Sequence, residues 1–167
     1  MMTNNLVTLP GYQITELIYD GVRSLVYRGT RSSDNQSVII KVLRNEYPTF
    51  SELLGFRNQY AIAHNLAHPN IIHPQALERY GNGYALIIAD VGAISLWDYW
   101  LQSKPDLKEF CHQAIQLTEA LHYLIQQRII HKDIKPGNIL IHPETQHVTL
   151  IDSVSYTHLT LPTTSRV

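Results

Sequence analysis

Three short runs of apolar and polar residues, separated by turn-forming segments, occupy the first quarter of the chain. The runs read YQITELIY, SLVYRGT and SVIIKVL, and the segments DG and SSDNQ lie between them within residues 12–43. Runs of this length, rich in β-branched and aromatic residues and bounded by turn residues, are typical of strands. The pattern therefore predicts a β-rich region over residues 12–43.

Two later segments carry apolar residues at alternating spacings of three and four, which places them on one helix face. The first begins near Thr49 or Ser51, either of which can cap it, and Pro69 would end it. A short aromatic-rich helix is expected at residues 95–102. The apolar stripes consist of Leu53, Phe56, Tyr60, Ala63 and Ala67 in the first helix and of Phe110, Ala114, Leu117, Leu121 and Leu124 in the last.

The remaining apolar runs predict further strands. Residues 70–73 and 84–89 are short apolar runs, and the turn GNG precedes the second. NILIHPETQHVTLID predicts a hairpin of two apolar strands around a PETQ turn. The order of elements indicates an α+β fold, with a β-rich lobe joined to a helical lobe near residues 89–94.

Composition narrows the class of protein. A chain of 167 residues with 44% apolar residues can form a real core, and a net charge of −1 leaves no electrostatic footprint for nucleic acid or an anionic membrane. The single cysteine, Cys111, excludes an internal disulfide. The start lacks the pattern of a secretory signal, and the longest nearly apolar stretch is broken by Asp90 and too short to span a bilayer. We expect a soluble, cytoplasmic chain.

The segment HKDIKPGNIL, residues 131–140, carries the strongest chemical signal. Phosphoryl transfer needs a carboxylate oriented on the attacking hydroxyl and positive charge around the transferred group. Asp133 could take or orient the hydroxyl proton, and Lys135 could supply a cation to the phosphoryl group. Asn138 offers a neutral oxygen to Mg²⁺, which prefers oxygen ligands.

This segment resembles the catalytic loop of protein kinases, H-R-D-L-K-P-x-N, with Asp133, Lys135 and Asn138 matching it residue for residue. The lysine at Asp133 plus two is the form seen in serine/threonine kinases. The expected hairpin would bring Asp152 beside Asn138, as the resemblance implies for the metal-binding Asp of the D-F-G motif. SVIIKVL resembles the strand motif V-A-I-K, with Lys41 as its lysine, and HPNII also resembles the family.

The resemblance implies a protein kinase-like two-lobe fold, with ATP and Mg²⁺ as cofactors. The adenine would lie against the linker. Backbone groups of Ala89, Asp90 and Val91 would be available to it, with Ile88 behind and Val26 over the ring. The glycine-rich loop pattern G-x-G-x-x-G-x-V keeps only Gly21, since Tyr19 and Ser24 occupy the other glycine positions.

Two further positions depart from the family pattern. The helix glutamate that pairs with the strand lysine falls on Gln59, which can hydrogen-bond Lys41 but cannot neutralise it. Glu52, two turns earlier, could substitute only if the helix slid. Lys132 replaces the arginine that pairs with a phosphorylated activation segment, so control by such phosphorylation is disfavoured.

A zinc site is the alternative that the histidines raise. His64 and His68 stand four residues apart in HNLAH, but the glutamate of H-E-x-x-H and an obvious third ligand are missing. Roles on a helix surface or in a turn are therefore favoured.

Two functions stay open. The first is transfer of the γ-phosphoryl of ATP to Ser/Thr hydroxyls of a protein substrate. The second is a pseudokinase or nucleotide-binding regulatory scaffold. The chain also resembles the N-terminal kinase module of large bacterial multidomain sensor proteins, which implies covalently linked downstream signalling domains.

The last fifteen residues differ from the rest of the chain. Back-translated, SVSYTHLTLPT resembles the transposase mosaic-end adapter used to prepare sequencing libraries, with a natural divergent terminus as the alternative. We therefore divide the chain into a leader (1–10), a nucleotide-binding lobe (11–90), part of a catalytic lobe (91–152) and a non-native tail (153–167). A chain truncated in this way is expected to be inactive and poorly soluble.

Overall fold

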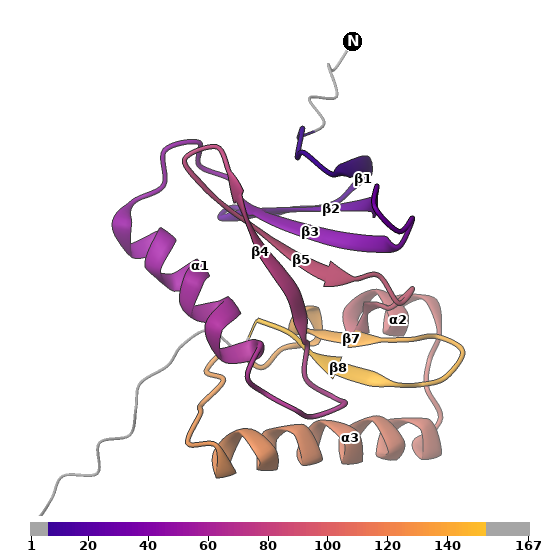
Figure 1. The fold of residues 1–167 in the computed structure, drawn as a ribbon. Helices are drawn as coiled ribbons and strands as arrows, with labels where there is room; N and C mark the ends of the chain where they lie inside the picture. Colours follow the sequence, from indigo (N-terminus) through magenta and orange to yellow (C-terminus); the bar gives the residue numbers. More distant parts are fainter. Residues whose placement is uncertain (1–6, 153–167) are drawn as a thin grey trace, which may run out of the picture. The chain divides into compact units, whose positions relative to one another are not determined.

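The computed structural model describes residues 7–152, and the predicted adapter-derived tail lies outside these residues (Figure 1). The described chain forms two compact units. The first takes the residues up to Ala67 together with Ile72–Ala93, and the second takes His68–Ile71 and the residues from Ile94 onward. The mixture of strands and helices confirms the α+β class.

The first unit is built on a five-stranded antiparallel sheet in the order β1-β2-β3-β5-β4. Its strands are β1 (Tyr12–Asp20), β2 (Ser24–Arg31), β3 (Ser37–Leu43), β4 (Pro74–Tyr80) and β5 (Gly83–Ala89). The three strands predicted within residues 12–43 are confirmed, and so is the strand predicted at residues 84–89.

The core of the first unit lies on one face of this sheet. Side chains alternate between the faces of a strand, so every second residue of β3 points to the same side. Leu9 is buried in this core although it precedes β1, so the sequence assigned to the leader contributes to packing. The buried cluster consists of Leu9, Tyr27, Val38, Ile40, Val42, Ala85 and Ile87.

Helix α1 (Phe50–Ala63) packs against β4 and β5 and begins at the predicted Thr49 cap (Figure 1). The Thr49 hydroxyl accepts a hydrogen bond from the amide of Glu52, and the Glu52 carboxylate accepts one from the amide of Thr49. This reciprocal capping box satisfies two amides that lack partners inside the helix. The helix ends at Ala63, six residues before the proline expected to end it.

The second unit combines a small three-stranded antiparallel sheet with helices. Its elements are β6 (Ile94–Ser95), α2 (Leu96–Gln102), α3 (Leu107–Gln126), a 3₁₀ turn η1 (Pro136–Asn138), β7 (Ile139–Ile141) and β8 (Val148–Leu150). The short helix after Ser95, the long helix and the terminal hairpin are confirmed. Helix α3 packs against β8 (Figure 1).

Three local features differ from what the sequence predicts. Residues 70–73 form no strand, and only Ile71 makes an isolated parallel bridge, to Leu150. Strand β4 was not predicted at all. In α3 the predicted apolar stripe is confirmed at Leu124, which is buried, and wrong at Phe110, which is exposed. Gln113 and Gln116 are also buried.

No helix of residues 7–152 combines the length and the apolar character needed to cross a membrane.

Candidate active site

The loop after α3 brings the predicted residues of the HKDIKPGN segment together. The Lys135 ammonium lies 2.8 Å from Oδ2 of Asp133. The Asn138 amide nitrogen donates to the same oxygen at 2.7 Å and to the Asp133 carbonyl at 2.9 Å. Hydrogen bonds from Lys135 and then from Asn138 lower the pKa of the Asp133 carboxyl below its ordinary value. Asp133 therefore stays an ionised, exposed carboxylate throughout the neutral range.

Asn138 is held so that its amide oxygen remains for another ligand. Its side chain is buried, and its backbone amide donates to the Lys135 carbonyl at 2.8 Å across the 3₁₀ turn. Because the amide nitrogen is used by Asp133, the amide oxygen is the polar atom of this side chain left over from those bonds.

The hairpin β7–β8 connects Asn138 to the residue before Asp152. The amide of Ile151 donates to the Asn138 carbonyl at 3.0 Å, so the two ends of the hairpin lie side by side as predicted. Asp152 has a left-handed backbone (φ 57°), and Lys132 has another (φ 63°). Asn35, Arg128 and Gln146 also have this conformation, so it does not by itself mark a functional residue.

These residues fit a hard divalent cation. The Asn138 oxygen and the Asp152 carboxylate are the oxygen ligands that Mg²⁺ prefers. Within residues 7–152 there is no cluster of three or more His, Cys, Asp or Glu side chains that could hold a metal ion alone.

His131 belongs to the same assembly, although it was not among the predicted site residues. It is buried, and its Nε2 lies 2.8 Å from the carbonyl of Ile151. The amide of Asp133 donates to its Nδ1 at 3.4 Å. In the tautomer with a proton on Nε2, one imidazole connects the strand end before Asp152 with the loop of Asp133. Its position two residues before Asp133 is the sequence feature from which its role could have been predicted.

In the first unit, Lys41, Val26 and Ile88 share one face of the sheet. Lys41 pairs with Val26 on β2 and with Leu86 on β5, and directly opposed residues point to the same side. Ile88 follows Leu86 by two positions and so lies on that face as well. All three predicted residues are half-buried there, opposite to the core face.

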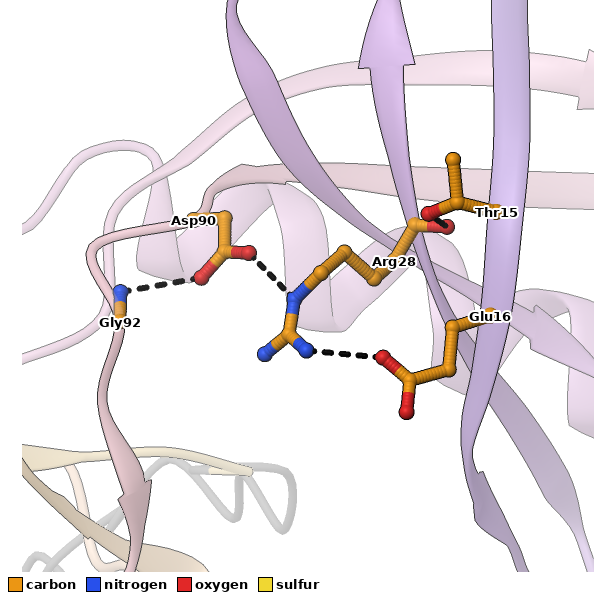
Figure 2. Close-up of polar contacts among 5 residues, drawn as sticks. All are labelled: Thr15, Glu16, Arg28, Asp90 and Gly92. Atoms are coloured by element: carbon orange, nitrogen blue, oxygen red, sulfur yellow. Dashed lines mark hydrogen bonds and ion pairs between the residues drawn. The ribbon is translucent and has the colours of Figure 1, made fainter.

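Strand β5 ends at Ala89, and the linker that follows it begins with Asp90 and Val91. Ala89 pairs with Val38, and the Asp90 amide donates to the Ser37 carbonyl at 3.1 Å. Val91 is exposed. The Asp90 carboxylate, for which no role was predicted, forms an ion pair with Arg28 (Figure 2).

The loop between β1 and β2 contains Gly21 in a tight turn. The Gly21 amide donates to the Ser24 carbonyl at 3.0 Å, and the Arg44 guanidinium donates to the Gly21 carbonyl at 3.0 Å and pairs with Asp20. A Cβ atom at position 21 would lie 2.3 Å from the ring of Tyr19, so that ring would have to move. Tyr19 thus occupies space that a glycine at its position would leave open.

Glu52 does not take the place of the expected helix glutamate. Both the amide and the hydroxyl of Thr49 donate to its carboxylate at 2.8 Å, and these bonds lower its pKa. Gln59, at the expected position, is buried, as are Phe56 and Ala63 of the same helix. The two histidines of HNLAH also have other partners: His64 Nδ1 lies 3.2 Å from the Pro74 carbonyl, and His68 Nδ1 accepts from the Asn70 amide.

Comparison with known proteins gives consistent matches. The family model described as "Protein kinase domain" matches residues 12–160. The chain is similar to Serine/threonine-protein kinase TIO of Arabidopsis thaliana, with 34% identity over 133 residues, which cover 78% of this chain and 10% of that protein. It is also similar to Serine/threonine-protein kinase PrkC of Bacillus subtilis (strain 168), with 33% identity over 132 residues, covering 78% and 20%. The chain thus spans about a tenth to a fifth of the length of these relatives.

Proposed function

The chain belongs to the protein kinase family, and we propose that the complete natural protein that contains it catalyses transfer of the γ-phosphoryl group of ATP to Ser or Thr hydroxyls of a protein substrate. The serine/threonine type is that of its relatives, and the five-stranded sheet with its helices fits the family's fold. The observation that carries the proposal is the Asp133 carboxylate, held by Lys135 and Asn138 at 2.8 and 2.7 Å.

Each residue of this loop has a proposed role in the transfer. Asp133 orients the substrate hydroxyl and takes its proton, which its ionised state permits. Lys135 contributes positive charge near the migrating phosphoryl group. Asn138 and Asp152 would hold Mg²⁺, which when bound supplies charge neutralisation on the phosphates. His131 positions Asp133 through the backbone.

The first unit would bind the nucleotide. Lys41 would contact the phosphates, and the Gly21 turn would lie over them. Val26 and Ile88, which share the sheet face with Lys41, would enclose the purine. Backbone groups of the linker, at Ala89, Asp90 and Val91, would recognise its edge.

The second candidate function is a nucleotide-binding scaffold without phosphotransfer. Two observations favour it: the Tyr19 ring fills space next to Gly21, and a neutral Gln59 occupies the buried position of the expected glutamate. The first limits how closely the backbone at Gly21 can approach a phosphate, and the second puts a neutral amide where a carboxylate would orient Lys41. Neither changes the proposed purine-binding residues. Such a protein would regulate signalling domains linked to it.

A phosphotransfer assay on the complete natural protein that contains this chain distinguishes the two functions. The isosteric variant Asp133→Asn is the control, because it keeps the loop but removes the proton acceptor. Catalysis predicts a loss of about 10²- to 10⁴-fold in kcat with ATP affinity retained. ATP binding without transfer to any of several Ser/Thr substrates, with Mg²⁺ varied, would establish the scaffold instead.

A further inference from the structure

Arg28 lies on the sheet face that carries the proposed nucleotide-binding residues. It pairs with Ile39 on β3, and Ile39 pairs with Ile88 on β5. Arg28 also follows Val26 by two positions on β2, so both side chains point to the same side. The guanidinium therefore extends from the purine-binding face of the first unit.

The Arg28 guanidinium connects three segments of that unit (Figure 2). Its Nε donates to Oδ2 of Asp90 at 2.6 Å, and its Nη1 donates to Glu16 on β1 at 2.9 Å. The other Asp90 oxygen accepts from the amide of Gly92 at 3.0 Å. A single cation thus links β1, β2 and the start of the linker.

The linker depends on these bonds because the regular strand pairing ends just before it. Ala89 is the last residue of β5, and the Asp90 amide makes one more bond, to Ser37. Beyond that point the Asp90 side chain supports the backbone by accepting a hydrogen bond from the Gly92 amide. Whatever fixes the Asp90 carboxylate therefore fixes the course of the chain through Val91.

The two ion pairs of Arg28, with Asp90 and with Glu16, differ in exposure and therefore in strength. The Asp90 side chain is only 9% exposed, whereas that of Glu16 is 58% exposed. Exposed ion pairs contribute little, because water and salt screen them. A carboxylate removed from water needs a hydrogen-bonded partner, and removing that partner is costly. The ion pair with Asp90 is therefore the stronger of the two.

We infer that Arg28 is a positioning residue, which sets purine selectivity by holding the linker backbone through Asp90. This inference rests on the proposed nucleotide-binding function. Adenine offers a donor at N6 and an acceptor at N1, whereas guanine offers an acceptor at O6 and a donor at N1. A linker that presents its carbonyl and amide groups at fixed positions distinguishes the two edges, and a loosened linker can adjust to either.

The test measures dissociation constants of ATP, GTP and tripolyphosphate, a probe without a base, on the complete natural protein. Two variants remove the ion pair between Arg28 and Asp90: Arg28→Gln and the isosteric Asp90→Asn. Asp90→Asn keeps an oxygen that accepts from the Gly92 amide. Glu16→Gln is the matched control, because it removes the exposed ion pair of Arg28. Melting temperatures identify any variant that fails to fold, in which case the other variant decides.

We expect Arg28→Gln and Asp90→Asn each to weaken ATP binding about tenfold, the scale of a lost charge-assisted hydrogen bond. GTP and tripolyphosphate affinities should stay the same, so the preference for ATP falls by that factor. The double variant should bind ATP no more weakly than either single variant. Glu16→Gln should change the dissociation constant of ATP less than about twofold. The dissociation constant for Arg28→Lys should lie between those of the unaltered protein and Arg28→Gln.

Two results would overturn the inference alone: an unchanged preference for ATP over GTP in both variants, or a parallel loss of tripolyphosphate affinity, which indicates general damage. Absence of ATP binding by the unaltered protein would instead overturn the proposed function, and the inference with it.

Discussion

Replacing Gln116 of α3 by leucine should destabilise the second unit, because this buried glutamine joins the helix to the hairpin that ends before Asp152. Its amide oxygen accepts from the Asn70 amide at 3.0 Å and from the backbone amide of Val148 at 2.9 Å. Its amide nitrogen donates to the Gln146 carbonyl at 2.8 Å. Leucine keeps most of the volume and none of these bonds.

The expected cost follows from what each partner loses. Val148 is 1% exposed, so water cannot replace the acceptor for its amide, and a buried unsatisfied group costs about 1–3 kcal/mol. Asn70 still donates to the Val148 carbonyl at 2.7 Å, and the Gln146 carbonyl can turn to water, so these two add about 1 kcal/mol together. We expect a loss of about 2–4 kcal/mol in the free energy of unfolding.

Urea unfolding of the chain, followed by tryptophan fluorescence, measures this loss. Both tryptophans, Trp97 and Trp100, lie on α2, so the signal reports the second unit. Gln126→Leu is the matched control, because it makes the same substitution at an exposed position of the same helix and should shift the free energy by less than about 0.5 kcal/mol. Equal unfolding midpoints for Gln116→Leu and Gln126→Leu would refute the reasoning.

Three further changes have defined outcomes. Lys135→Met should raise the pKa of Asp133, because it removes the hydrogen bond that contributes most to lowering that pKa. The carboxylate then becomes protonated at a higher pH, which a carbon-13 NMR titration detects. An unchanged titration midpoint would contradict this role of Lys135. Thr49→Ala should lower the stability of the first unit by about 1 kcal/mol, as seen in thermal unfolding by circular dichroism, whereas Thr49→Ser should retain it. Lys41→Met should weaken ATP binding by the complete natural protein about tenfold in calorimetry. Equal affinities would remove Lys41 from the phosphate site.

The elements that the sequence predicts correctly depend on signals between near neighbours. Thr49 with Glu52 three residues later forms a capping box, and both bonds lie within one helical turn. Strand β4 has no such signal: its sequence PQALERY starts with proline and does not alternate, and it lies at the edge of the sheet, where pairing on one side suffices. Its formation depends on β5, not on its own residues.

The buried glutamines of α3 show the same limit in a helix. The apolar stripe predicts that Phe110 is buried, but Phe110 is exposed and the polar Gln113 is buried. Gln113 is satisfied by Trp100 and by Gln146, which lie 13 and 33 positions away in the chain. Whether a polar side chain can be buried depends on partners that only the fold supplies.

The residues of the candidate site also differ in whether near neighbours in the sequence suffice to predict their contacts. Asp133, Lys135 and Asn138 lie together because five positions and one 3₁₀ turn separate them, so their spacing alone predicts their proximity. Arg28 and Asp90 are 62 positions apart and meet only because β2, β3 and β5 pair in register. A motif therefore identifies the residues that would carry out the chemistry. The ion pair that holds the linker can be identified only from the sheet, and we propose that in this chain it influences which base is bound.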